Sequence, residues 1–295
     1  MGIGRTVWTW GEMIKFSHSV FALPFALMAV FLAARSQGGP GAGQLALIII
    51  CMVAARSFAM TVNRLADAGI DARNPRTSVR ALPAGRIQRR QAVAFAAISA
   101  ALLVAACEGF RRWHGNAIPL RLAAPTLALL AGYSFSKRFT AFSHFLLGGV
   151  IGFAPLAAWI AIDPQSLGLP AVILSASVCL WIAGLDLIYA CQDVEVDRRE
   201  GLFSIPSRWG IGPALLLSRG CHVTTVVLLA ILGRIEHLGI IYWIGLIATA
   251  VLLAIEQSLV RPNDLSRVNL AFFTLNGMVS LGLGAATIGD IVARR

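Results

Sequence analysis

Nine long apolar windows, separated by short polar loops, constrain this chain more than any other feature of its sequence. A membrane-spanning helix needs about 20 mainly apolar residues, and a spanning segment has to satisfy its own backbone hydrogen bonds. Only 13% of the 295 residues are charged, against about 25% in soluble domains. The sequence therefore predicts an all-α, polytopic membrane bundle of nine transmembrane helices, which form a single membrane-embedded domain over residues 1–295. The windows cover approximately Val20–Ala34, Leu45–Val62, Ala92–Cys107, Leu122–Phe135, Phe145–Ile162, Ala171–Tyr189, Ala214–Leu232, Ile240–Ile255 and Leu270–Ile288.

The basic residues predict the orientation of these helices. The net charge is +11, and the basic residues are spread over the loops between windows. If the N-terminus is cytoplasmic and each window crosses once, 16 Lys and Arg residues lie on the cytoplasmic side and 7 on the other. Because Lys and Arg favour cytoplasmic loops, we expect a multi-pass protein of the inner (plasma) membrane. This distribution argues against nucleic acid as a partner and favours the lipid bilayer and an anionic substrate.

Aspartates gather at the cytoplasmic ends of two windows. Seven of the 14 acidic residues fall in two short segments, and each segment contains an aspartate pair spaced i, i+4. This spacing puts Asp67 and Asp71 on one face of a helix, and likewise Asp193 and Asp197. The second pair follows the first by 126 residues (193 − 67 and 197 − 71). The equal offset predicts two pseudo-equivalent four-helix halves plus one further helix.

Two aspartate pairs beside a membrane need a counter-charge. An unpaired charge within a bilayer costs about 3 kcal/mol on insertion scales. Carboxylate oxygens without a nearby His or Cys trio select Mg²⁺ or Ca²⁺ over zinc. Mg²⁺ typically takes one or two carboxylates and completes its shell with water and substrate phosphates. We therefore expect Asp67, Asp71, Asp193 and Asp197 to hold Mg²⁺ and present it to a diphosphate. The alternative, inert hydrated loop charges, is weaker because both pairs occupy equivalent places and have basic residues just downstream.

Basic residues near the aspartates are candidates for binding the diphosphate. Lys137 and Arg138 end the fourth window, and Arg80 follows the first aspartate pair. Arg makes bidentate phosphate contacts, whereas Lys acts as a point charge. Each of these residues, taken singly, also satisfies the rule that cytoplasmic loops are basic. Tyr189, within the second acidic segment, either hydrogen-bonds the site or is an interface aromatic residue, and both interpretations stay open.

At these residues the chain resembles the UbiA superfamily of membrane prenyltransferases. The family's first acidic motif, NxxxDxxxD, is matched by Asn63, Asp67 and Asp71. Its second acidic motif, DxxYAxxDxxxD, is matched by Asp186, Tyr189, Ala190, Asp193 and Asp197. Two further stretches, Tyr133–Thr140 and Arg80–Gly85, are similar to the family's YPxxKRxT and RPLPxG motifs, with Ser134 and Ala81 in place of proline.

The resemblance implies Mg²⁺-dependent transfer of a polyprenyl group from polyprenyl diphosphate to an aromatic acid in quinone biosynthesis. The stretches Phe16–Pro24 and Glu200–Pro206 look like the branch labelled 4-hydroxybenzoate polyprenyltransferase-like, so 4-hydroxybenzoate is the first expectation for the acceptor. A dihydroxynaphthoate of menaquinone biosynthesis is the alternative. His18 either contacts substrate or is an interface residue. The resemblance implies catalytic roles for Asp67, Asp71, Asp193, Asp197 and Lys137, and binding roles for Asn63, Arg80, Arg138, Asp186 and Tyr189.

Two other kinds of protein compete with this interpretation. A cation-coupled transporter would carry acids near mid-helix, at helices broken by Gly or Pro, whereas these acids cluster at helix ends. An enzyme of the same superfamily acting on haem or chlorophyllide is the second rival. We also expect Arg56 or Arg64 to lie near the pocket of a carboxylated acceptor, although Arg56 alternatively extends to the interface or pairs with an aspartate.

Overall fold

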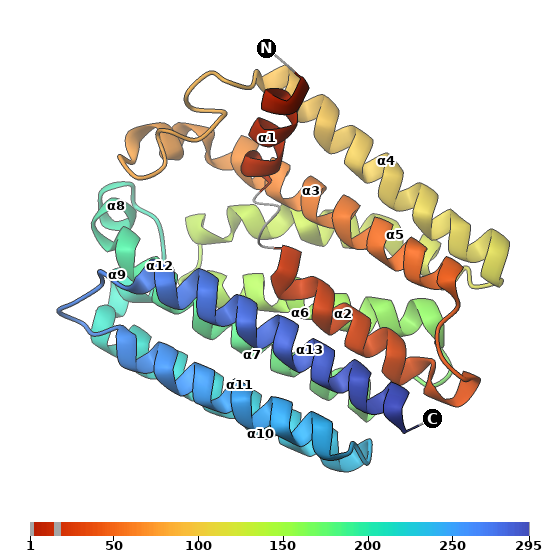
Figure 1. Ribbon diagram of the computed structural model, residues 1–295. Helices are drawn as coiled ribbons and strands as arrows, with labels where there is room; N and C mark the ends of the chain where they lie inside the picture. Colours follow the sequence, from red (N-terminus) through yellow and green to blue (C-terminus); the bar gives the residue numbers. More distant parts are fainter. Residues whose placement is uncertain (1–2, 15–18, 295) are drawn as a thin grey trace. The chain divides into compact units, whose positions relative to one another are not determined.

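The computed structural model describes residues 3–14 and 19–294, and these residues are almost entirely helical (Figure 1). Eight helices of the described chain are long and apolar enough to cross a membrane, and Phe21–Ala33 forms a shorter apolar helical stretch. Strand pairing among the described residues is limited to one isolated bridge between Arg261 and Asp264. The predicted all-α membrane architecture is confirmed, and each of the nine predicted windows coincides with a helix.

The helix boundaries extend several windows and add short helices between them. Four short non-α segments are the 3₁₀ helices η2 (Arg35–Gln37), η3 (Tyr133–Arg138) and η4 (Cys191–Asp193) and the π-helical η5 (Ala271–Leu275). The α-helices are α1 (Ile3–Met13), α2 (Ser19–Ala33), α3 (Ala42–Arg73), α4 (Arg89–His114), α5 (Ile118–Gly132), α6 (Ser143–Ile162), α7 (Leu169–Ala190), α8 (Val194–Arg199), α9 (Ile205–Trp209), α10 (Ile211–Ile235), α11 (Ile240–Leu259), α12 (Val268–Leu270) and α13 (Asn276–Ala293).

The chain forms two compact units, and the first contains α1, most of α3, α4 and α5. This unit consists of residues 46–135 and the described part of residues 1–19. Its three long helices share an apolar cluster to which α3 contributes Ala54, α4 contributes Cys107 and α5 contributes Ala123. Helix α1 was not among the predicted apolar windows. Its last residue, Met13, belongs to an apolar cluster with Ala81. The loop after α3 is therefore covered by the N-terminal segment of the same unit.

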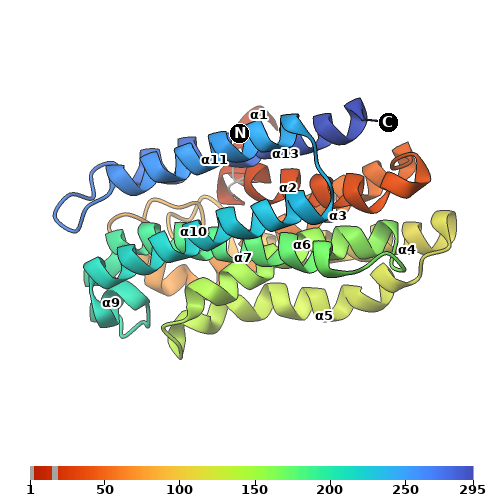
Figure 2. The same ribbon diagram turned by 90° about the horizontal axis from the view of Figure 1, so that it is seen from below.

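The second unit contains α2 and α6 to α13, from residues 20–45 and 136–295. Helix α7 packs along α6 and α10, and α11 packs along α13 (Figure 1 and Figure 2). Glycine permits the close α6–α7 approach, since a Cβ added at Gly148 would lie 2.3 Å from the carbonyl oxygen of Cys179. Its neighbour Gly149 meets nothing within 4 Å. Only one glycine of this pair is therefore required for packing, as expected where small residues form helix interfaces in lipid.

A buried polar network joins four helices of the second unit. Trp181 on α7 donates its indole N–H to Asn276 Oδ1 on α13 at 2.7 Å, and Asn276 Nδ2 donates to Glu256 Oε1 on α11 at 2.9 Å. The other Glu256 oxygen, Oε2, lies 3.9 Å from Nδ1 of His222 on α10. Buried polar groups need partners, so the two hydrogen bonds fix how α7, α11 and α13 pack, while Glu256 Oε2 makes no hydrogen bond to the described residues. None of these four residues was predicted from the sequence as a site residue.

Candidate functional site

The first acidic motif occupies the last turns of α3. Because α3 continues without interruption to Arg73, Asn63, Asp67 and Asp71 follow one another at one-turn intervals along one face. Asn63 Nδ2 donates a hydrogen bond to Asp67 Oδ2 at 3.2 Å. The helical placement predicted for this motif is confirmed, and it presents an amide and two carboxylates in a row.

The second of these carboxylates has arginine partners. Arg80 Nη1 lies 2.7 Å from both Oδ1 and Oδ2 of Asp71, and Arg64 Nη1 lies 3.9 Å from Oδ2. The chain returns Arg80 to the helix through a turn in which Thr77 Oγ1 donates to the backbone carbonyl of Asp71 at 3.0 Å. Arg80 therefore balances the charge of Asp71, while its predicted contact with a diphosphate stays a prediction.

Arg56, about two helical turns before Asn63 on α3, differs from Arg64 in its contacts. The Arg64 side chain is 9% exposed and donates a hydrogen bond to Asn63 Oδ1 at 3.4 Å. The Nε atom of Arg56 is buried and has no hydrogen-bonding partner among the described residues. Arg56 interacts electrostatically with Tyr133, which follows α5 in the same unit. A buried guanidinium donor without an acceptor is costly, so Arg56 is available to bind an anionic oxygen.

The second acidic motif straddles a break in the helix. Helix α7 ends at Ala190, the 3₁₀ turn η4 follows, and α8 begins at Val194. Asp186 therefore belongs to α7, Asp193 caps α8, and Asp197 lies in the first turn of α8. Acidic residues are favourable at this end of a helix because of its dipole. The i, i+4 spacing of Asp193 and Asp197 does not reveal that the helix breaks just before them. The break leaves Asp186 and Asp197 on two different helices.

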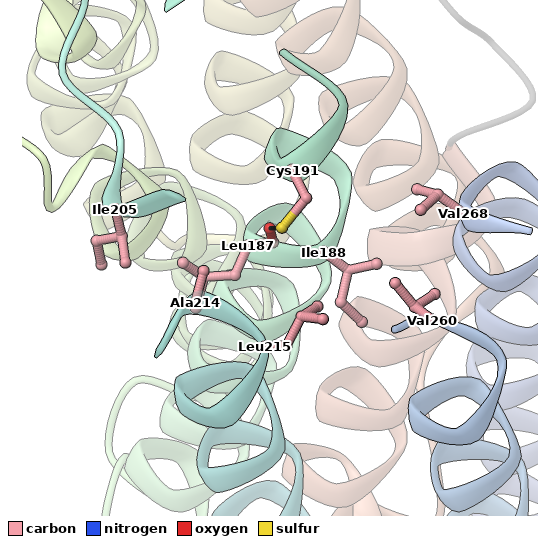
Figure 3. Packing of buried hydrophobic residues seen from close by; sticks show 8 residues of the cluster. All are labelled: Leu187, Ile188, Cys191, Ile205, Ala214, Leu215, Val260 and Val268. Carbon is pink, nitrogen blue, oxygen red and sulfur yellow. Dashed lines mark hydrogen bonds between the residues drawn. The ribbon is translucent and has the colours of Figure 1, made fainter. Parts of the chain in front are cut away.

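An apolar cluster fixes the backbone around this break (Figure 3). Leu187 and Ile188 on α7 and Cys191 on η4 are at most 3% exposed. They pack with Ile205 at the start of α9, with buried residues of α10 and α12, and with Val260 directly after α11. Leu187, Ile188 and Cys191 lie between Asp186 and Asp193 in the chain. The cluster therefore anchors one side of the broken segment, and the carboxylates extend from the remaining positions.

Hydrogen bonds link the second motif to α6 and to the segment that follows the motif. Asp186 Oδ2 lies 2.6 Å from Nδ1 of His144 on α6, and Ser204 Oγ donates to Asp197 Oδ2 at 2.7 Å. Neither His144 nor Ser204 was singled out as a site residue from the sequence. The stretch containing Ser204 was noted only as typical of one branch, and nothing local distinguishes His144 from any other histidine near a helix start.

Lys137 is close enough to this motif to act on its charge. It interacts electrostatically with both Asp186 and Asp197. Its backbone carbonyl accepts a hydrogen bond from the Phe203 N–H at 2.7 Å, so η3 is tied to the loop before α9. Arg138, the next residue, is exposed at the end of η3. The structure thus brings Lys137 together with the second acidic motif, whereas the phosphate-binding role of Arg138 stays a prediction.

Tyr189 packs among aromatic rings of the second unit. Its ring centroid lies 4.4 Å from that of Phe272 and 6.5 Å from that of Phe273. Phe272 also contacts Phe21 of α2 edge to face. The tyrosine therefore borders an aromatic wall beside the second acidic motif, and its hydrogen bond to the site stays a prediction. His18, the other residue proposed from the sequence, lies outside the described residues.

The donor atoms of both motifs suit Mg²⁺ better than a softer metal. Among the described residues no three His, Cys, Asp or Glu side chains come together as a metal-binding group. Each motif instead offers carboxylate pairs next to basic residues. Mg²⁺ is commonly bound in this way, through one or two carboxylates and substrate phosphates. The residues present therefore fit a magnesium ion that is completed by a diphosphate.

The fold and the two motifs define a class: a helical membrane protein with two aspartate-rich segments beside basic residues. The chain belongs to the UbiA prenyltransferase family, whose model matches residues 22–278. It is 29% identical to a 4-hydroxybenzoate octaprenyltransferase of Nitrosospira multiformis, over 91% of this chain and 89% of the relative. This membership identifies the protein as a prenyltransferase of the membrane, in place of the rival cation-coupled transporter.

Solved structures show the same fold. A UbiA homolog from Aeropyrum pernix K1 in its apo form aligns with a TM-score of 0.81 and 31% identity, covering 92% of this chain and 98% of that chain. A UbiA homolog from Archaeoglobus fulgidus bound to GPP and Mg²⁺ aligns with a TM-score of 0.69 and 17% identity, covering 95% and 99%. This chain therefore shares its fold with a protein whose structure was solved with GPP and Mg²⁺ bound.

Proposed function

We propose that this protein transfers a polyprenyl group from polyprenyl diphosphate to an aromatic acid, with 4-hydroxybenzoate as the acceptor, in quinone biosynthesis. The observation that carries the proposal is the pair of acidic motifs, each on a helix end and each held beside a basic residue (Arg80 with Asp71, and Lys137 with Asp186). The name of the Nitrosospira multiformis relative supports the choice of acceptor. The reaction takes place at the cytoplasmic face of the inner membrane, where the basic loops are expected.

In this proposal the acidic motifs bind diphosphate through magnesium. Asp67 and Asp71 of the first motif, and Asp193 and Asp197 of the second, would hold Mg²⁺, with Asn63 as a neighbouring amide. When bound, Mg²⁺ supplies electrostatic stabilisation of the diphosphate as negative charge develops on its bridging oxygen. Lys137 and Arg138 add positive charge on the same group, and Lys137 already interacts with the second motif.

Departure of the diphosphate starts the carbon chemistry. The allylic carbon–oxygen bond breaks, and both electrons leave with the diphosphate. The ring carbon ortho to the phenol oxygen then forms a bond to the allylic carbon, and loss of a ring proton restores aromaticity. Apolar helix walls and the aromatic ring of Tyr189 keep water away from the electron-deficient allyl group. A membrane location suits a donor whose hydrocarbon tail has to remain in lipid.

Arg56 is the residue that we assign to the acceptor carboxylate. Its buried Nε lacks a hydrogen-bonding partner among the described residues, whereas Arg64 is already engaged by Asn63 and Asp71. A carboxylate at Arg56 would satisfy that donor with a charge-assisted hydrogen bond. Both 4-hydroxybenzoate and a dihydroxynaphthoate carry such a carboxylate. The ring pocket, and not Arg56, therefore has to discriminate between them.

Product analysis tests the proposed function directly. Purified protein is offered prenyl diphosphates of several lengths together with 4-hydroxybenzoate or a dihydroxynaphthoate, with and without Mg²⁺, and the products are identified by mass spectrometry. We expect prenylated 4-hydroxybenzoate and free diphosphate only when Mg²⁺ is present. Prenylation of the dihydroxynaphthoate alone would move the protein to menaquinone biosynthesis. Failure to prenylate either acid, in protein that binds diphosphate, would overturn the assignment.

A further inference from the structure

His144 is a fully buried histidine for which the proposed chemistry has no use. Its side chain is 0% exposed at the start of α6. Its two ring nitrogens contact different parts of the second unit: Nδ1 lies 2.6 Å from Asp186 Oδ2, and Nε2 lies 3.3 Å from the backbone nitrogen of Ile205. Both contacts are within hydrogen-bonding distance, so the imidazole bridges α7 and α9.

The backbone contact determines which nitrogen carries the proton. The amide of Ile205 can only donate, so Nε2 of His144 has to accept and is unprotonated. A neutral imidazole with an accepting Nε2 carries its proton on Nδ1, which then donates to the Asp186 carboxylate. Because Nε2 is occupied by the backbone, His144 is not arranged to serve as a general base. Its geometry is that of a residue that orients another group.

The bridge continues to the other side of the helix break. Ile205 is the first residue of α9, and Ser204 is the N-cap of that helix. The hydroxyl of Ser204 donates to Asp197 Oδ2 at 2.7 Å. Asp186, before the break, and Asp197, after it, are therefore connected through His144, Ile205 and Ser204. Because η4 interrupts the helix between the two aspartates, helical geometry alone does not set their separation.

We propose that His144 is a positioning residue that fixes the separation of Asp186 and Asp197 across the helix break. Such a residue acts through the groups it orients, since ligands have to be held within about 0.5 Å of their working geometry. The inference rests on the proposed function, which places the second acidic motif at the magnesium diphosphate site, with Asp197 holding the metal and Asp186 in a binding role. It adds a residue and a role that neither acidic motif contains.

Two substitutions at one position separate the contacts of His144. His144→Phe keeps an aromatic ring but removes both hydrogen bonds. His144→Asn places an amide near the position of Nδ1, so it retains a donor for Asp186 but loses the contact with Ile205. Binding of inorganic diphosphate in the presence of Mg²⁺, measured by calorimetry in detergent, reports the site without turnover. We expect about tenfold to hundredfold weaker binding for His144→Phe, the size of a lost hydrogen bond to a charged group, and a smaller loss for His144→Asn.

His222→Phe is the matched control, since it removes another buried imidazole of the same unit. His222 on α10 contacts Gln257 and the backbone carbonyl of Trp181, and neither of these residues belongs to the second acidic motif. We expect this variant to unfold at a lower temperature but to bind magnesium diphosphate like the parent. Equal losses of binding in His144→Phe and His222→Phe would reduce His144 to a general packing role and overturn the proposal.

The tautomer provides a second readout that packing alone does not change. Nitrogen NMR of protein with ¹⁵N-labelled histidine should show a signal, absent in His144→Asn, with its proton on Nδ1. Asp186→Asn should shift that signal, because the bonded carboxylate becomes an amide. A proton on Nε2, or unchanged diphosphate binding in both His144 variants, would overturn the inference. If the parent binds magnesium diphosphate but transfers no prenyl group, the proposed function fails while the role of His144 stands.

Discussion

One nitrogen of Arg80, Nη1, lies 2.7 Å from both carboxylate oxygens of Asp71. These are the same two oxygens that the sequence predicts as ligands of Mg²⁺. Arg80 and a bound cation therefore compete for Asp71, or share it. The ion pair supplies the counter-charge that a buried carboxylate needs, and Mg²⁺ binding has to compensate for any loss of it.

Substitution of Arg80 tests this competition. Arg80→Gln leaves the buried Asp71 without its closest cation, so we expect the free energy of unfolding to fall by about 2 kcal/mol in the absence of metal. Mg²⁺ should then raise the unfolding temperature of the variant more than that of the parent. Arg86→Gln is the control, because Arg86 pairs with Glu12 at 3.6 Å on the surface. Equal Mg²⁺ stabilisation in all three proteins would contradict the competition.

Removal of one charge from either acidic motif should abolish turnover. Asp67→Asn and Asp193→Asn each take away a carboxylate proposed to hold Mg²⁺, yet keep the side-chain shape. Because groups that act as a unit are not additive, the double variant should be no less active than either single one. Steady-state rates over a range of Mg²⁺ concentrations, with circular dichroism as a check on folding, measure this. Near-parental activity of either variant at low Mg²⁺ would refute the two-motif metal site.

The two arginines of α3 should differ in their kinetic effects. Arg56→Gln removes the proposed partner of the acceptor carboxylate, so the KM for the aromatic acid should rise about tenfold to hundredfold, while the KM for the prenyl diphosphate stays unchanged. Arg64→Gln should affect the diphosphate as well, since Arg64 contacts Asn63 and lies 3.9 Å from Asp71. Initial rates with each substrate varied in turn provide the comparison. An equal rise of both KM values in Arg56→Gln would argue that Arg56 is structural.

The sequence predicted the elements that depend on local properties and missed those that depend on distant contacts. Apolar length revealed the spans, and helical spacing placed Asp67 and Asp71 on one face because α3 is continuous. The break at η4 was not foreseen, since the apolar run and the i, i+4 spacing are the same in a straight helix. His144 escaped notice because its partners lie 42 and 61 residues away in the chain. A single polar residue carries no local sign of such a contact.

The α6–α7 interface predicts opposite outcomes for two adjacent glycines. A Cβ at Gly148 would lie 2.3 Å from the carbonyl oxygen of Cys179, a backbone atom that cannot move without shifting α7. Gly148→Ala should therefore destabilise the protein by about 1–3 kcal/mol. Gly149→Ala meets nothing within 4 Å, and the better helix propensity of alanine should leave stability equal or slightly higher. Thermal unfolding in detergent compares the two, and equal losses would contradict the described packing.

The orientation of the acidic motifs is open to direct measurement by cysteine labelling. Val79, in the loop after α3, is 68% exposed, and Arg199, at the end of α8, is also exposed. The predicted topology places both loops in the cytoplasm, because Lys and Arg are concentrated there. Val79→Cys and Arg199→Cys should react with a membrane-impermeant maleimide only after the cells are permeabilised. Gln165→Cys, in the exposed loop between α6 and α7, should react before permeabilisation, and the parent with its five native cysteines gives the background. Labelling of Val79→Cys and Arg199→Cys in intact spheroplasts would place the acidic motifs on the outer face and reverse the topology.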